Sequence, residues 1–124
     1  MIKKEDLRIG NWIKDGHDFE QVTSYHIKCV EFGRCEYDPI ELTEEILLKC
    51  GFEINNRPSK DVYIEFNPRM AILFNQGNVG EMDLIQDGKF ISFKHGHIKF
   101  LHQLQNLFYS LTNEELIYTP WNTL

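Results

Sequence analysis

The chain has 124 residues, a length that fits one domain with a single hydrophobic core. Apolar residues make up 42% and charged residues 26%, which is typical of a folded protein and argues against a chain that is disordered throughout. Nineteen acidic and thirteen basic residues give a formal charge of −6, which argues against binding of nucleic acid or anionic membrane over the whole surface.

Two further features concern the compartment. No apolar run approaches the roughly 20 residues that span a bilayer, and the first residues lack the hydrophobic region of a signal peptide. We therefore expect a cytoplasmic protein with no membrane contact. Cys29, Cys35 and Cys50 show no CxxC spacing, so free and mostly buried thiols are expected in that reducing compartment.

The N-terminal part predicts two β-strands. The first covers residues 7–13, and the dipeptide Asp15-Gly16 that follows suits a hairpin turn because glycine accepts positive φ. The second is expected over residues 19–32, where β-branched and aromatic side chains are frequent. Its length predicts a bend or bulge near Thr23-Ser24.

A short helix is predicted over residues 44–50, with capping signals at both ends. Thr43 is the expected N-cap, and Glu44 and Glu45 lie at the positive end of the helix dipole. Gly51 is the expected terminator. Beyond it, β-rich runs separated by Asn, Pro and Gly predict an antiparallel meander, with strands at residues 62–66, 70–74, 82–85 and 90–93.

The last predicted element is a helix over residues 98–111, which ends near Asn113. Six apolar residues form one stripe at helical spacing and must be buried: Phe100, Leu101, Leu104, Leu107, Phe108 and Leu111. The opposite face carries His102, Gln103 and Asn106 but no charge, whereas a solvated face usually carries Glu, Lys and Arg. This face is a candidate protein-contact surface. Packing within the fold, or plain exposure, is the alternative.

Catalytic motifs are absent from the sequence. There is no Gly-rich phosphate loop, GxSxG, HExxH or EF-hand pattern, so we expect neither an enzyme nor a cofactor. His95, His97 and His102 are the best metal candidates, but no carboxylate or thiolate completes the set, and polar residues before a helix are the simpler interpretation. Cys50 is expected to be a core residue rather than a nucleophile.

Lys89, Lys94 and Lys99 occur in a stretch without acidic residues, between Asp87 and Glu114, and aromatic residues lie among them. Basic residues interleaved with aromatics can bind single-stranded nucleic acid through phosphate contacts and base stacking. The phenylalanines also alternate as a buried strand face would.

Three blocks of sequence carry a resemblance. Residues 7–12 (LRIGNW), 39–52 (PIELTEEILLKCGF) and 101–116 (LHQLQNLFYSLTNEEL) resemble, in the same order, a family of small uncharacterised proteins from gut bacteria and their prophages. The resemblance covers about a third of the chain. It implies a phage or mobile-element origin and a shared fold, but no activity, substrate or catalytic residue. Members often carry Gly where this chain has Asn113, and Asn serves the same backbone role.

Together these patterns predict a single α+β domain over residues 1–124, with a curved antiparallel sheet and one short and one long C-terminal helix packed on it. The expected function is a non-enzymatic interaction module that holds an unknown protein partner, or a second copy of itself, through His102, Gln103 and Asn106. The alternative is nucleic-acid binding through the Lys89 to Lys99 segment.

Overall fold

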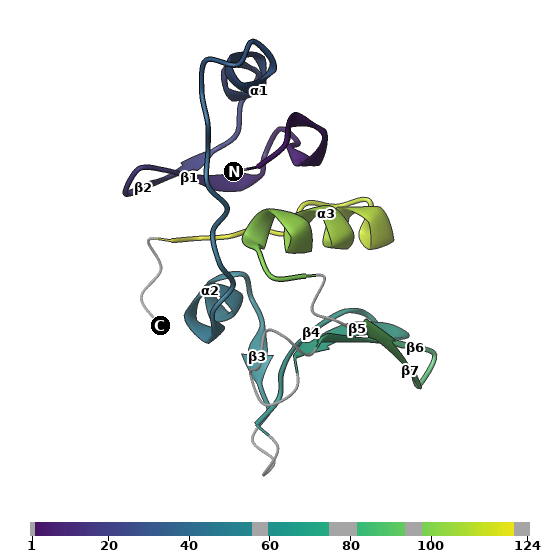
Figure 1. The fold of residues 1–124 in the computed structure, drawn as a ribbon. Helices are drawn as coiled ribbons and strands as arrows, with labels where there is room; N and C mark the ends of the chain where they lie inside the picture. The colour runs from purple at the N-terminus through teal and green to yellow at the C-terminus, as the bar shows by residue number, and fades with distance from the viewer. Residues whose placement is uncertain (1, 56–59, 75–81, 94–97, 121–124) are drawn as a thin grey trace. The chain divides into compact units, whose positions relative to one another are not determined.

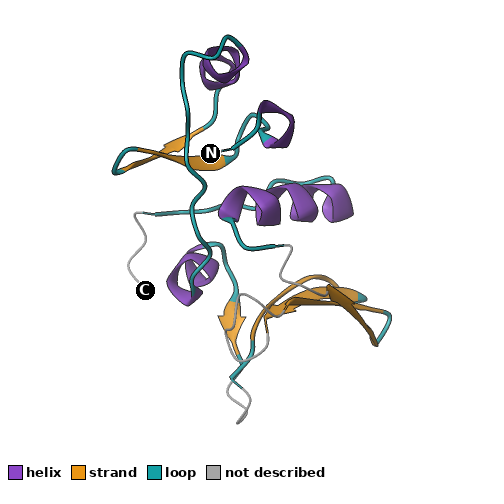
Figure 2. Ribbon diagram, in the orientation of Figure 1, coloured by secondary structure: helices purple, strands orange, loops and turns teal. Residues whose placement is uncertain are grey.

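The computed structural model describes residues 2–55, 60–74, 82–93 and 98–120. It confirms the α+β class, since antiparallel sheets occur together with helices that include one near the C-terminus (Figures 1 and 2). The chain divides into two compact units: unit 1 comprises residues 1–41 and 100–115, and unit 2 comprises residues 42–99 and 116–124. A single domain over residues 1–124 stays a prediction.

Unit 1 contains one hairpin and two helices. In chain order its elements are the short 3-10 turn η1 (Lys4–Asp6), strands β1 (Trp12–Asp15) and β2 (Asp18–Gln21), and helices α1 (Ser24–Glu31) and α3 (Leu101–Thr112). Strands β1 and β2 pair antiparallel and close at the Asp15↔Asp18 pair, with Gly16 at φ +62°. The predicted hairpin turn is therefore confirmed, although its first strand begins at Trp12.

The single strand predicted over residues 19–32 is wrong, because the chain forms β2 and then α1 there. The Thr23 N–H donates to His26 Nδ1 at 3.0 Å, and His26 Nε2 lies 3.1 Å from Glu20 Oε2. These contacts cap the helix N-terminus. Ile27 and Val30 are three residues apart, so in a helix both reach the core cluster. This packing outweighs their β-propensity.

The expectation of free thiols is wrong for two of the three cysteines. Cys29, on α1, and Cys35, beyond its C-terminus, form a disulfide with their Cα atoms 5.3 Å apart. Residues with Cα atoms at this spacing can be bridged without moving the backbone. Cys50 is free and buried, as expected. Spacing along the chain could not show this pair, because it is the end of α1 that brings Cys29 and Cys35 together.

Helix α3 confirms the predicted C-terminal helix, with shifted ends. Its N-cap is Phe100, and it ends at Asn113, whose left-handed backbone (φ +59°) is the conformation expected of a terminating Asn. Leu101 and Leu104 are fully buried and Phe108 is 7% exposed, so these three residues of the apolar stripe are core, whereas Phe100, Leu107 and Leu111 are half-buried. Within unit 1, α3 contacts β1.

Unit 2 contains one helix and a five-stranded sheet. Its elements are helix α2 (Glu44–Lys49) and strands β3 (Glu53–Ile54), β4 (Val62–Asn67), β5 (Met70–Phe74), β6 (Met82–Gln86) and β7 (Lys89–Phe93). The N-cap prediction is confirmed, since Thr43 Oγ1 accepts from the Ile46 N–H at 3.2 Å. Gly51, at φ +91°, follows the C-cap as predicted.

The sheet is an antiparallel meander, as predicted, in the order β3-β4-β5-β6-β7, although β3 was not among the four predicted strands. One face is core, and its buried side chains are those of Val62, Ile72, Phe74, Met82 and Leu84. The other face carries two cross-strand rows, which the register places side by side: Glu53, Tyr63, Leu73 and Asp83 in one, and Glu65, Ala71 and Ile85 in the next. We call these seven residues the acidic face.

The tail after α3 packs within unit 2. Leu116 and Tyr118 are 4% and 5% exposed, and the Thr119 N–H donates to the Lys49 carbonyl at 3.1 Å. Ile117 points outward and is 65% exposed.

Candidate functional site

The amides on α3 bind the N-terminal segment of unit 1. Asn106 Oδ1 accepts from Asn11 Nδ2 at 2.9 Å and from Arg8 Nε at 3.1 Å, and Asn106 Nδ2 donates to the Asp6 carbonyl at 3.1 Å. The Asn106 side chain therefore already has three partners within the chain. This arrangement explains the absence of charge at position 106, because an amide both donates and accepts here.

Gln105, which the sequence analysis did not single out, is the most deeply buried polar side chain of α3. It is 1% exposed, its Oε1 accepts from the Trp12 N–H at 2.8 Å, and its Nε2 donates to the Gly10 carbonyl at 3.1 Å. Its position beside the apolar stripe was the one sign in the sequence that Gln105 could be buried. Its partners could not be predicted, because they lie about 95 residues away along the chain.

His102 and Gln103 have different environments. His102 is 4% exposed, its Nδ1 has no hydrogen-bond partner, and burial lowers its pKa, so it stays neutral at pH 7. Gln103 is half-buried, and its Oε1 accepts from the Phe100 N–H at 3.1 Å. The structure thus brings both residues and Asn106 onto one helix, and their role in an interface stays a prediction.

Arg8 is a residue that sequence reasoning missed. Its guanidinium pairs with the Glu115 carboxylate, donates to the Gln105 carbonyl and lies 4.4 Å from the centroid of the Tyr109 ring. These contacts join the N-terminal segment to the end of α3. The arrangement is structural, since each donor of Arg8 that is named here already faces a group of the chain itself.

The predicted basic residues lie in unit 2. Lys89 begins β7 and is exposed, and Lys99 is exposed before α3, while Lys94 lies outside the described residues. His95 and His97 also lie outside them. Over the described parts of the chain, no three His, Cys, Asp or Glu residues gather as metal ligands would. Nor does any described helix have the length and apolarity to cross a bilayer.

Cys50, expected from the sequence to be a core residue rather than a nucleophile, is a free and buried thiol. Burial raises its pKa from an ordinary 9.0 to about 12. A thiol becomes nucleophilic as the thiolate, whose fraction near pH 8 falls by about a thousandfold for such a shift. The position is therefore unsuited to catalysis.

We expect Cys50 to resist thiol reagents in the folded protein. Without reductant at pH 8, the aromatic disulfide dithiobis(nitrobenzoate) should label no cysteine within minutes, and one cysteine per chain should react after addition of denaturant. The denatured protein is the positive control, because its rapid reaction shows that the reagent is active. Rapid labelling of the folded protein at Cys50 would contradict the burial that sets its pKa.

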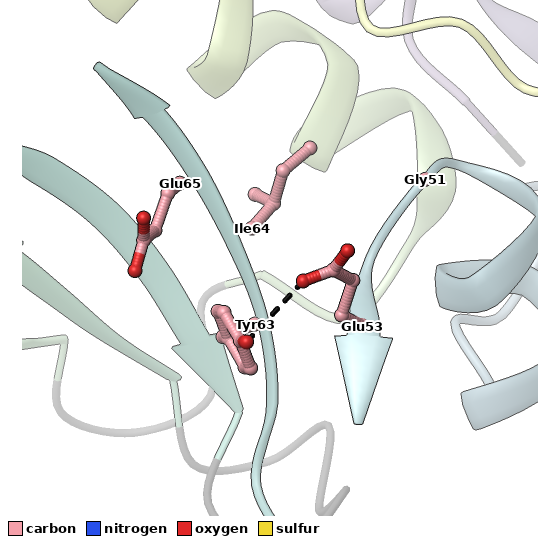
Figure 3. A pocket seen from close by; sticks show the side chains of 5 residues that line it. All are labelled: Gly51, Glu53, Tyr63, Ile64 and Glu65. Carbon is pink, nitrogen blue, oxygen red and sulfur yellow. Dashed lines mark hydrogen bonds between the residues drawn. The ribbon is translucent and has the colours of Figure 1, made fainter. Parts of the chain in front are cut away.

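A cavity of about 250 Å³ opens at the edge of the sheet in unit 2, lined by Gly51, Glu53, Tyr63, Ile64 and Glu65 (Figure 3). Tyr63 Oη donates to Glu53 Oε2 at 3.2 Å, which links β4 to β3 at the end of their ladder. Both glutamates are exposed. The cavity lies where the chain leaves α2 and the two strands separate.

A third surface feature is a pair of exposed aromatic side chains on α1. Tyr25 is 70% exposed and Phe32, at the C-cap, is 72% exposed. They are seven residues apart, so two helical turns place them on the same side of α1. We call Tyr25 and Phe32 the aromatic pair.

Comparison with known proteins found no family model, no curated protein and no solved structure that matches the chain.

Proposed function

We propose that this protein is a non-enzymatic protein-interaction module, and that the aromatic pair on α1 is its contact surface. The observation that carries the proposal is the exposure of Tyr25 and Phe32, each above two thirds, on one side of a short helix. Large aromatic side chains are the residues that most often dominate binding energy when a partner covers them. A phage or mobile-element origin, implied by the three resembling sequence blocks, belongs to the same proposal.

Rigidity of α1 supports this role. The contacts of His26 with Thr23 and Glu20 hold the N-terminal end, and the Cys29–Cys35 disulfide closes the chain around Phe32. A surface that is already ordered loses less conformational entropy when it binds. The aromatic pair is therefore presented in a conformation close to the one that a partner would contact.

The contacts of α3 favour α1 as the surface. Asn106 is bonded inside unit 1 and His102 is buried, so a partner would have to replace contacts that the fold already makes. Gln103 and Asn106 are both half-buried. A partner that binds the aromatic pair would not have to replace such contacts, because both side chains are exposed.

The test is a double variant, Tyr25→Ser with Phe32→Ser. Because both side chains are exposed, the free energy of unfolding should change by less than about 0.5 kcal/mol for each site. Capture of the protein's specific partner from a host lysate, or self-association in sedimentation, should fall at least about tenfold, as expected for aromatic anchors.

Ile9→Ser is the matched control, because Ile9 is 58% exposed in unit 1 but does not lie on α1. This variant should bind as the wild type does. A folded double variant that keeps every partner and oligomeric state would overturn the proposal. Recovery of nucleic acid that depends on Lys89 and Lys99, and not on the aromatic pair, would support nucleic-acid binding instead.

A further inference from the structure

The outer edge of β4 is open beyond its second residue. Strand β3 pairs with β4 at Ile54↔Val62 and Glu53↔Tyr63 and no further. The Asn55 N–H donates to the Asp61 carbonyl at 2.7 Å, so the backbone groups of Asp61 point toward β3. Because strand residues alternate, the N–H and C=O of Glu65 point to the same side, where the described residues provide no strand.

The described segment that precedes β3 does not close this edge. The register would place Gly51 opposite Glu65, but the Gly51 N–H donates to the Leu48 carbonyl at 3.1 Å and the Phe52 N–H to the Leu47 carbonyl at 3.1 Å. Both donors are used to end α2. The helix terminus therefore holds the chain away from β4, and the cavity of about 250 Å³ lies in the space that results (Figure 3).

Charge identifies the kind of chain that fits. Glu53 and Glu65 line the cavity, Asp83 lies on the acidic face in the same row as Glu53, and strands β3 to β6 contain no lysine or arginine. Tyr63, Leu73 and Ile85 on the same face are half-buried. Such a surface repels phosphate groups and suits a segment that alternates basic and apolar side chains.

A second hollow adds to the surface. It measures about 230 Å³, and its lining includes Glu65, Ala71 and Ile85 of the acidic face together with Arg69. Glu65 thus separates the two hollows, one at the β4 edge and one over the sheet. A strand laid along β4 would place alternate side chains beside both.

We propose that the open edge of β4 binds an extended peptide segment bearing lysine or arginine by strand addition, with Glu65 supplying backbone hydrogen bonds and Glu53 and Glu65 the opposing charge. In strand addition, main-chain hydrogen bonds hold the peptide and alternate side chains give specificity. Because the carboxylates are exposed, their ion pairs contribute little each. The backbone contacts therefore dominate, and the site goes beyond the proposed role of α1 without depending on it.

The probe is a pair of acetylated and amidated pentapeptides, Val-Lys-Val-Lys-Val and Val-Glu-Val-Glu-Val, titrated against the full chain by calorimetry. The lysine peptide should bind at least about tenfold more tightly than the glutamate peptide. Equal affinity, or no binding of either peptide at millimolar concentration, overturns the proposal. Spermine should compete poorly, since it has charge but no peptide backbone, and competition equal to that of the lysine peptide would also overturn it.

Two variants separate backbone from charge. Glu65→Pro removes the outward N–H, which makes no ladder bond, and proline is tolerated at such edge positions. This variant should weaken binding at least about tenfold, and Glu65→Gln, which keeps the N–H, only a few-fold. Glu114→Gln removes the same charge from exposed unit 1 surface and should bind as the wild type does. If the folded Glu65→Pro variant bound the lysine peptide as tightly as the wild type does, strand addition would be ruled out.

A modified peptide keeps the test decisive should Glu65→Pro fail to fold. N-methylation of alternate amides of the lysine peptide should abolish binding in one of the two alternating sets and spare it in the other, because only one set faces β4. Loss in neither set, or in both equally, overturns the proposal. The Tyr25→Ser, Phe32→Ser variant should bind the peptide normally, so failure here and failure of the α1 surface are distinguishable.

Discussion

Leu104→Ala should lower the free energy of unfolding by about 2–5 kcal/mol, the range for truncation of a buried leucine. Leu104 is fully buried in the apolar stripe of α3, so the variant loses the transfer energy of the removed methyl groups and leaves a cavity. Urea denaturation followed by circular dichroism measures the change.

Leu107→Ala is the matched control for this experiment. Leu107 lies on the same helix but is only half-buried, so the same truncation should cost clearly less. A loss below about 0.5 kcal/mol at Leu104 would show that the stripe is not core. Equal losses at both positions would show that burial does not distinguish them, and helix propensity could not be the cause because alanine is the better helix former.

Gln105→Leu should lower the free energy of unfolding by about 2–3 kcal/mol, although it adds apolar surface to a buried site. The substitution removes the acceptor of the Trp12 N–H and one donor to the Gly10 carbonyl. A buried polar group that loses its partner costs more than an average hydrogen bond contributes.

Ser110→Leu controls for the introduced side chain. Ser110 is exposed on α3, and its Oγ donates only to the Leu107 carbonyl at 2.7 Å. Leucine there should change stability by less than about 0.5 kcal/mol. If Gln105→Leu proved as stable as the wild type, the two hydrogen bonds would not be holding α3 to the N-terminal segment.

Elements with local signals were predictable from sequence. Helix α2 has its N-cap Thr43 and terminator Gly51 within one stretch, and the strands of the meander are bounded by turn residues. The meander strands were placed within one residue at either end. Helix α1 was missed because Val, Ile and Tyr favour strands, and a histidine that caps a helix leaves no standard motif.

The candidate sites were less predictable, for a physical reason. The α3 amides looked like a surface because their partners, residues 6–12, lie about 95 residues away in sequence. The open edge of β4 depends on the register of Glu53 against Tyr63 and on a helix end that uses the Gly51 N–H. Neither the register of β3 nor the use of the Gly51 N–H by α2 can be predicted from the sequence pattern.

The chain leaves unit 1 and re-enters it at neighbouring points. Glu41 forms an antiparallel bridge with Phe100 inside unit 1, and the Leu42 N–H donates to the Lys99 carbonyl at 2.9 Å inside unit 2. Residues 42–99 are therefore, in topological terms, an insertion with adjoining ends. Loop closure across such ends grows only slowly more costly with length. We therefore expect a change of length within this stretch to leave in place the hydrogen bonds that residues 1–41 and 100–115 make to one another.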